Sequence, residues 1–219
     1  MLKDITAPYS AVESWLYDRL VAPAVQPLHR ALAAEFLARV SEGASVLEVG
    51  CGGGHFALLA VAERRSLTWT GVDLSKEQVE RAGRRAAGIP KLKFLAGDAL
   101  ALPFEGRSFD AVVSIASLKH WPDRGRGLRE CARVLRPGGV LFIAEADRAS
   151  SPEEQDRFVS MLRLPRFFRP GFRAVFRRAI AGRSVDLAGA RALLSGVALA
   201  ENQVQRMAGM PLWIMTGRA

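Results

Sequence analysis

The sequence of 219 residues suits one domain, and with 49% hydrophobic and 24% charged residues it can bury an ordinary core. That balance excludes a disordered, collagen-like or disulfide-stapled chain. No run approaches the ~20 apolar residues of a membrane-spanning helix, and the first twenty residues lack a signal peptide's apolar core. We therefore expect a cytoplasmic protein.

The net charge of +9 is concentrated in one segment. Between Asp156 and Asp186 there is no acidic residue, whereas arginine recurs throughout. The arginines are Arg157, Arg163, Arg166, Arg169, Arg173, Arg177, Arg178 and Arg183. These eight charges nearly equal the whole excess, so the rest of the chain is close to neutral and the segment needs its own explanation.

From residue 45 the sequence alternates between strand and helix patterns. Residues 1–44 have helical periodicity interrupted by Pro23 and Pro27. The predicted strands are 45–49, 67–73, 92–96, 111–115 and 140–145, and the predicted helices are 55–63, 75–87 and 123–135. Ser75 with Gln78 predicts a capping box, and 136–139 (Arg-Pro-Gly-Gly) predicts a turn. Such alternation predicts an α/β fold with a parallel sheet covered on both faces.

After residue 150 the alternation stops for the arginine-rich segment and then resumes. A short helix near 186–194 precedes two strands at about 200–207 and 211–216, which are separated by Ala-Gly-Met. So short a connection predicts an antiparallel hairpin, which completes a seven-stranded sheet.

Ligands of open parallel sheets bind at the carboxyl ends of the strands, so the residues that follow each strand carry the chemistry. After the first strand the chain reads Glu48-Val-Gly50-Cys-Gly52-Gly-Gly54, which allows a tight turn close to a ligand. Asp73 ends the second strand, where a carboxylate can accept hydrogen bonds from ribose hydroxyls. Asp98 follows the third strand and suits the amino group of an adenine.

The glycine loop with Asp73 also fits a loose dinucleotide fingerprint, so a nicotinamide-dependent oxidoreductase is one interpretation. Three features argue against it. An acid stands two residues before the first glycine, Asp98 adds a second acid, and the chain has no room for a second substrate domain.

Six ordered motifs between about Tyr17 and Glu145 resemble a class I S-adenosylmethionine-dependent methyltransferase of the small-molecule type, similar to the ubiquinone and menaquinone biosynthesis enzymes. They are 46–54 (Val-Leu-Glu-Val-Gly-Cys-Gly-Gly-Gly), 71–75 (Gly-Val-Asp-Leu-Ser), 97–99 (Gly-Asp-Ala), 102–104 (Leu-Pro-Phe), 108–114 (Ser-Phe-Asp-Ala-Val-Val-Ser) and 133–139 (Arg-Val-Leu-Arg-Pro-Gly-Gly). The resemblance implies a Rossmann-like, seven-stranded, mostly parallel sheet with a helical lid after the fifth strand. It divides a single domain, 1–219, into N-terminal helices (1–44), a cofactor-binding core (45–147), the lid (148–184) and a final helix and hairpin (185–219).

The resemblance also implies the cofactor, S-adenosylmethionine, and where it binds. Glu48, Gly50 and Gly52 hold its methionine part, with Cys51 as a small apolar filler in the same loop. Asp73 takes the ribose, Leu74 packs on the adenine, and Asp98 and Ala99, after Gly97, bind the adenine edge. Ser114 and Ile115 line the end of the fourth strand beneath the sulfonium, and Tyr17 reaches the cofactor's carboxylate.

Several alternatives stay open. Asp98 could cap a turn, and Glu48 could cap amides of the glycine loop. His120 is the candidate catalytic residue, because a histidine there could accept a proton from the acceptor. The alternative is that it caps or packs at the start of the helix that begins near Asp123. No metal is expected. Methyl transfer to an oxygen, nitrogen or carbon nucleophile of a small molecule is the predicted function, and a non-catalytic cofactor-binding regulator is the other alternative.

The arginine-rich lid allows three interpretations. Arg166, Arg169, Arg173 and Arg177 recur at helical spacing beside an apolar stripe of Phe168, Phe172, Val175, Phe176 and Ile180. The arginines could be solvated, could engage an anionic or lipid-like acceptor or a membrane surface, or could bind RNA phosphates. RNA is the least favoured of the three, DNA is not expected, and the sequence leaves the oligomeric state open.

Overall fold

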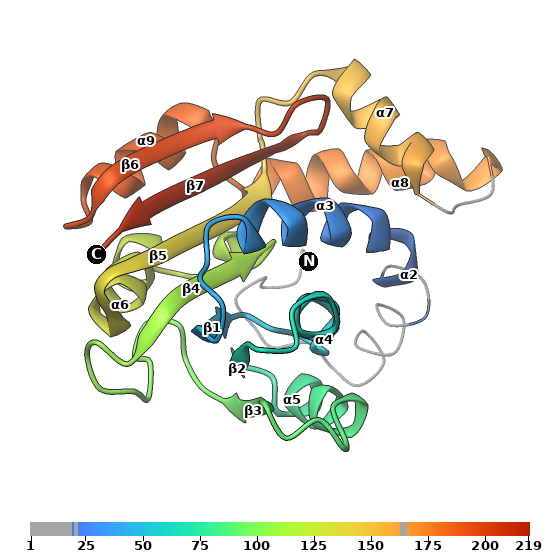
Figure 1. The fold of residues 1–219 in the computed structure, drawn as a ribbon. Helices are drawn as coiled ribbons and strands as arrows, with labels where there is room; N and C mark the ends of the chain where they lie inside the picture. Colours follow the sequence, from blue (N-terminus) through green and yellow to red (C-terminus); the bar gives the residue numbers. More distant parts are fainter. Residues whose placement is uncertain (1–18, 20–21, 163–165) are drawn as a thin grey trace.

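The computed structural model describes residues 19, 22–162 and 166–219, and its described part forms a seven-stranded sheet (Figure 1). The strand order is β3-β2-β1-β4-β5-β7-β6. The strands are β1 (Ser45–Val49), β2 (Thr68–Asp73), β3 (Leu92–Ala96), β4 (Phe109–Ile115), β5 (Leu135–Ala146), β6 (Ala200–Arg206) and β7 (Leu212–Arg218). All neighbours pair in parallel except β7, which runs antiparallel to both β5 and β6. The predicted fold class and closing hairpin are confirmed.

Helices cover both faces because the buried strands are apolar on both sides. Alternate residues of β1 illustrate this, since Val46 belongs to one apolar cluster and Leu47 to the other. On the Val46 face lie α3 (Gln26–Leu37) and α4 (His55–Glu63), and on the Leu47 face lie α6 (Arg124–Val134) and α9 (Leu187–Ser195). α5 (Lys76–Arg85) packs beside β2 and β3, and the short α2 (Ala22–Ala24) precedes α3.

Side-chain caps start α5, α6 and α9, where the sequence places Ser or Asp. Asp123 and Asp186 accept the backbone N–H three residues on, which begins α6 and α9. Ser75 caps α5 in the same way through Gln78 N at 3.4 Å. The predicted capping box is wrong in its second half, because Ser75 N donates to Asp73 Oδ1 at 2.9 Å and leaves Gln78 Oε1 without a partner among the described residues.

The predicted turn at 136–139 is part of β5, which therefore starts five residues earlier than expected. The longer strand is possible because β4 also starts earlier, so that Phe109 pairs with Leu135 before the register shifts at Ala111. Gly138 absorbs this irregularity with a φ of 78°.

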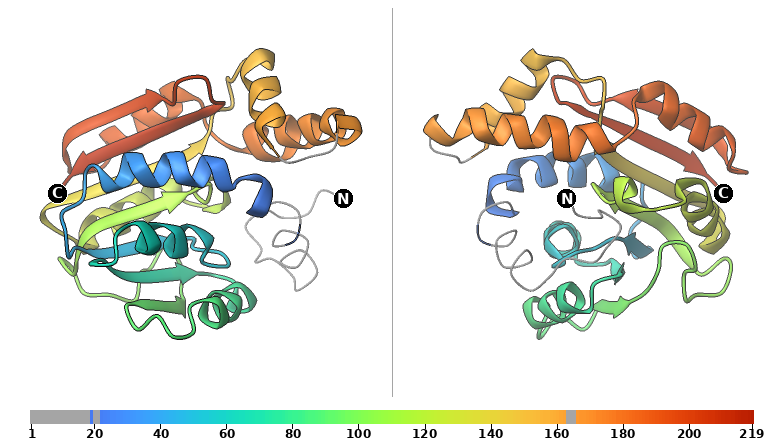
Figure 2. Two further views of the ribbon diagram at one scale, coloured as in Figure 1. Left: turned by 45° about the vertical axis from the view of Figure 1, so that its right-hand side comes forward. Right: turned by 180° about the vertical axis from the view of Figure 1, so that it is seen from behind.

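The segment after β5 is helical, as expected for a lid. It comprises α7 (Pro152–Met161), η3 (Arg166–Phe168), α8 (Arg169–Val175), η4 (Phe176–Ile180) and η5 (Ala181–Arg183). In both views of Figure 2, α7 and α8 lie near one end of the strands β5 and β7, and β3 lies at the opposite edge of the sheet. Phe158 and Phe176, whose rings are 5.1 Å apart, join the lid to Leu212 of β7 in a third apolar cluster. None of the helices in the described ranges has the length and apolar character needed to cross a bilayer.

Phe36 of α3 provides a test of how the N-terminal helix is held. Its fully buried ring contacts the rings of Phe56, Trp69 and Phe142, with centroids 5.6–6.4 Å apart. We expect Phe36→Ala to lower the free energy of unfolding by about 3–5 kcal/mol, because it leaves a cavity between α3 and the sheet. Phe167→Ala is the control, since that side chain is 76% exposed. Urea denaturation measures both, and equal losses would contradict this account of the core.

Candidate functional site

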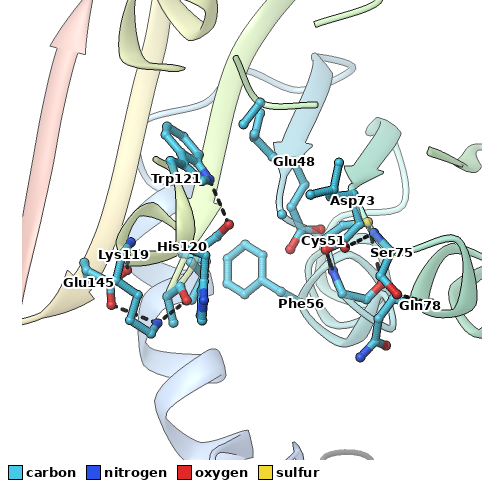
Figure 3. Close-up of a pocket in the computed structure, with 18 of the residues that line it drawn as sticks. Glu48, Cys51, Phe56, Asp73, Ser75, Gln78, Lys119, His120, Trp121 and Glu145 are labelled. Carbon is cyan, nitrogen blue, oxygen red and sulfur yellow. Dashed lines mark hydrogen bonds and ion pairs between the residues drawn. The ribbon is translucent and has the colours of Figure 1, made fainter. Parts of the chain in front are cut away.

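A cavity of about 390 Å³ opens at the carboxyl ends of β1 to β5 and beneath the lid (Figure 3). Predicted residues from four strand ends line it together: Glu48, Gly50, Cys51, Gly52, Asp73, Leu74, Gly97, Asp98, Ala99 and Ile115. His120 lines it as well. Tyr17 lies outside the described residues. The strand ends thus converge on one site, as expected for an open parallel sheet.

The glycine loop passes directly over the end of β2. The backbone amides of Gly50 and Cys51 both donate to Val72 O, at 2.8 and 3.0 Å. Gly50 has a φ of 77°, and a Cβ on it would lie 1.9 Å from Ser117 Oγ, so only glycine fits there. This close approach joins the loop after β1 to the loop after β4.

Asp73 holds the loop through both of its carboxylate oxygens. Oδ2 accepts from Gly52 N at 2.8 Å, and Oδ1 accepts from Ser75 N at 2.9 Å. Burial raises the pKa of Asp73, and these two hydrogen bonds partly oppose the rise. Each oxygen keeps a further lone pair, so the carboxylate can still accept hydrogen bonds from a ligand.

Glu48 lines the cavity and is only 2% exposed. Its Oε2 accepts from Trp69 Nε1 at 3.0 Å, so the alternative in which it caps loop amides is not what the structure shows. Burial raises the pKa of Glu48 to about 8, the Trp69 hydrogen bond opposes this rise, and the charge of Asp73 adds to it. A buried acid of this kind favours a cationic neighbour.

The outer wall beyond β2 and β3 is more exposed. Leu74 lies on the cavity with 52% of its side chain exposed, which leaves an apolar surface free to pack on a ligand. Asp98 does cap a turn, since its Oδ1 accepts from Leu100 N at 2.9 Å, and it also lines the cavity. The two interpretations of Asp98 are therefore compatible.

Ser114 does not line the cavity, although it was expected to do so beside Ile115. Successive residues of a strand point to opposite faces, so when Ile115 packs with the cluster around α3 and α4, Ser114 turns away from it. Its hydroxyl is fully buried, with no hydrogen-bond partner within the described part of the chain. Ser117, next to Gly50, occupies the cavity wall instead.

Both cysteines are neutral, apolar fillers. Burial raises the pKa of the Cys51 thiol well above its ordinary value, with Glu48 adding to the effect. It raises that of Cys131 to about 12. Neither is an activated nucleophile. In the described ranges no three His, Cys, Asp or Glu side chains gather in a way that could hold a metal ion.

Gln78, Lys119 and Glu145 are among the lining residues that were not predicted from the sequence. Gln78 is 3% exposed and its Oε1 has no partner among the described residues. Lys119 and Glu145 form a buried ion pair at 3.1 Å on the opposite side of the cavity (Figure 3). Glu145 lies near the end of β5 and Lys119 follows β4, so inspecting every strand end would have found them.

His120 ends the short helix η2 (Leu118–His120), which directly follows β4. Its backbone N–H donates to Ser117 O at 2.9 Å, and the residue lines the cavity beside Lys119. His29 also lines it, but burial lowers the pKa of that imidazole to about 4, with His55 contributing. His29 is therefore neutral near pH 7.

Residues 47–143 match the family model described as a methyltransferase domain. Two similar proteins are the 27-O-demethylrifamycin SV methyltransferase of Amycolatopsis mediterranei, 41% identical over 113 residues, and the fatty-acid O-methyltransferase of Mycolicibacterium smegmatis, 43% identical over 105 residues. These matches cover 50% and 48% of the present chain but only 41% and 38% of the two relatives.

Among solved structures, phosphoethanolamine N-methyltransferase 2 of Haemonchus contortus, in complex with S-adenosylmethionine, superposes with a TM-score of 0.68 at 22% identity. It covers 91% of this chain and 44% of that one, and at this identity the likeness concerns the fold. Residues 47–143 are therefore assigned to the methyltransferase domain family, and the fold is that of a methyltransferase solved with S-adenosylmethionine. That assignment decides against the nicotinamide alternative.

The raised pKa of Glu48 makes stability depend on pH. The unfolded carboxyl ionises near 4.5 and the folded one near 8, so the native state holds a proton that the unfolded state has lost. This contribution is fully present below about 4.5 and is lost as pH rises toward 8. We expect the free energy of unfolding to fall by up to about 1.4 kcal/mol per pH unit between pH 6.5 and 8.

The Glu48→Gln variant should lack that component, because its amide does not titrate. Urea denaturation of the ligand-free protein across this range measures the difference in slope. The range avoids His29, whose lowered pKa acts with the opposite sign below 6.5. Parallel slopes for the two proteins would show that Glu48 ionises normally.

Proposed function

We propose that the protein transfers a methyl group from S-adenosylmethionine to a nucleophilic atom of a small-molecule acceptor. The observation that carries this proposal is the division of one cavity into two halves. Carboxylates and the glycine loop lie at the ends of β1, β2 and β3, and an apolar lid with Lys119 and His120 faces them from the β4 and β5 side. A charged, polar cofactor suits the first half and an acceptor the second.

In this proposal the cofactor half takes adenosine as the motifs predict. The Asp73 carboxylate accepts the ribose hydroxyls, Leu74 packs on the adenine, and Asp98 with Ala99 binds its edge. Glu48, Gly50, Cys51 and Gly52 surround the methionine part, whose ammonium suits a buried acid. Gln78 Oε1 offers an additional acceptor close to Ser75, and Ser117 replaces Ser114 at the end of β4.

S-adenosylmethionine, when bound, supplies a methyl group on a sulfonium that is already a strong electrophile. The chain's own task is to align the acceptor with that methyl and to exclude water. Phe158, Phe172, Phe176 and Ile180 of the lid line the cavity and supply an apolar cover. His120 can accept a proton at its imidazole where the acceptor must lose one.

The lid suits an acceptor that is lipid-like or reached at an anionic lipid surface. The lid exposes Met161, Phe167, Phe168 and Val175, and the ring centroids of Phe167 and Phe168 are 4.4 Å apart with the rings tilted by 41°. Arg166, Arg177 and Arg178 are exposed there and make no ion pair among the described residues, whereas Arg173 pairs with Asp156 at 2.7 Å. Exposed aromatic side chains next to exposed arginines suit binding to the head-group region of an anionic lipid membrane. A cytoplasmic location stays a prediction from the sequence.

Replacing Asp73 tests the cofactor half. We expect Asp73→Ala to weaken binding of S-adenosylhomocysteine by about 1.5–3 kcal/mol, because ribose hydroxyls lose a charged acceptor and Gly52 N loses its partner. Asp110→Ala is the matched control, since Asp110 also accepts a backbone amide, from Ser45 at 2.8 Å, but lies at the other end of β4. Calorimetry should show near-normal affinity for the control, and an unchanged affinity for Asp73→Ala would remove it from the site.

Replacing the lid arginines tests the lipid-surface proposal. The variant with Gln at Arg166, Arg169, Arg173 and Arg177 should sediment far less with anionic liposomes at low salt, because each basic residue is worth roughly 1 kcal/mol near head groups. The control carries the same number of Gln changes at exposed arginines elsewhere: Arg65, Arg84, Arg129 and Arg191.

Cofactor affinity should be unchanged in both variants, since the adenosine residues belong to strand ends. Loss of sedimentation in both would indicate a general charge effect. A wild-type protein that ignores anionic liposomes at low salt, where charges are least screened, would leave only a dissolved acceptor.

A further inference from the structure

The ion pair between Lys119 and Glu145 is buried beside the cavity and is held by further hydrogen bonds to backbone amides. Glu145 is fully buried and Lys119 is 7% exposed. The two carboxylate oxygens of Glu145 also accept from Lys119 N at 3.1 Å and Ala146 N at 2.9 Å. The carboxylate is thereby fixed by backbone amides, and it fixes the ammonium in turn.

The ammonium of Lys119 has one hydrogen left. It donates to Glu145 Oε1 and to the carbonyl oxygen of Ala116, and an ammonium carries three N–H groups. Among the described residues nothing accepts the third. A buried N–H without an acceptor is costly, and Lys119 lines the cavity, so a ligand atom can supply the missing acceptor.

The position of the pair in the fold indicates which ligand this is. Lys119 follows β4, and Glu145 lies near the end of β5. Asp73 ends β2 and Asp98 follows β3, on the other side of β1. In Figure 3 Lys119, Glu145 and His120 lie together across the cavity from Asp73, Ser75 and Gln78. The lid residues Phe158 and Phe172 line the same cavity.

We propose that Lys119 binds an anionic oxygen of the methyl acceptor, a carboxylate or a phenolate, with Glu145 as its positioning residue. This inference rests on the proposed function, since it assigns the acceptor half of that site. A protonated amine has no lone pair, so Lys119 acts as a hydrogen-bond donor and keeps the oxygen in its nucleophilic, anionic form. The apolar lid holds the remainder of such an acceptor.

Matched ten-carbon probes test this preference by calorimetry on protein saturated with S-adenosylhomocysteine. We expect decanoate to bind at least tenfold more tightly than decanol or decylamine. Lys119→Met should abolish that preference, Lys119→Arg should retain part of it, and Glu145→Gln should reduce it. The Arg84→Gln/Arg129→Gln variant is the control, because it removes two exposed charges that do not line the cavity and should keep the preference.

Removing one member of a buried ion pair can unfold a protein, so thermal unfolding is measured for each variant. The double variant Lys119→Met/Glu145→Gln leaves no uncompensated charge and should also lack the preference. If wild-type protein binds S-adenosylhomocysteine but treats the three probes alike, this inference is wrong and the proposed function stands. If Lys119→Met instead weakens S-adenosylhomocysteine tenfold, Lys119 serves the cofactor, and if wild-type protein binds no S-adenosylhomocysteine, both proposals fail.

Discussion

The position of β1 between β2 and β4 is the constraint on which the site depends. The chain moves outward from β1 to β2 and β3, and then returns to the other side of β1 to form β4 and β5. The connections leaving β1 and β4 therefore diverge, and a crevice opens above β1. Gly50 allows the two loops to meet there, since a side chain at that position would collide with Ser117. The same reversal separates the carboxylates of β2 and β3 from the ion pair of β4 and β5.

Two acidic side chains, Glu48 and Asp73, lie in the crevice, and their pKa values suit a cationic ligand. Glu48 and Asp73 are close enough that the charge of Asp73 contributes to the raised pKa of Glu48, and burial raises the pKa of both. A cation placed between them lowers both values again, because an opposite charge favours the ionised carboxyl. S-adenosylmethionine carries cationic centres, the sulfonium and the ammonium, so under the proposed function its binding is coupled to the ionisation of these two acids. The cavity is in this sense electrostatically matched to its cofactor class.

The sequence predicted the architecture well because the alternation of apolar strands and capped helices is a local signal. The helix at 55–63 and the strand at 92–96 have the predicted bounds, and the hairpin follows from its short connection. Errors arose where a tertiary partner decides. Ser75 N binds Asp73 rather than Gln78, and β5 extends backward because β4 offers a partner at Phe109.

The site residues were predictable where a motif names them, and less so where orientation matters. Ser114 and Ile115 are neighbours in sequence, yet strand alternation sends only Ile115 to the cavity. The Lys119–Glu145 pair joins residues 26 positions apart, and each alone resembles an ordinary charged residue. Only the register of β4 against β5, in which Ile115 pairs with Ala144, brings their ends together.

The arginine-rich lid, which carries most of the chain's excess positive charge, also has apolar residues on two sides. Its predicted apolar stripe divides in the structure, so that Phe172, Phe176 and Ile180 line the cavity while Phe168 and Val175 are exposed. Phe168 and Phe172 are four residues apart, and residues at this spacing share one side of a helix. An apolar track thus runs from the outer surface to the cavity wall, bordered by exposed arginines. Under the proposed function, this track offers an acceptor with an anionic head and an apolar body a route from a lipid surface to the cavity, along which its apolar part stays out of water.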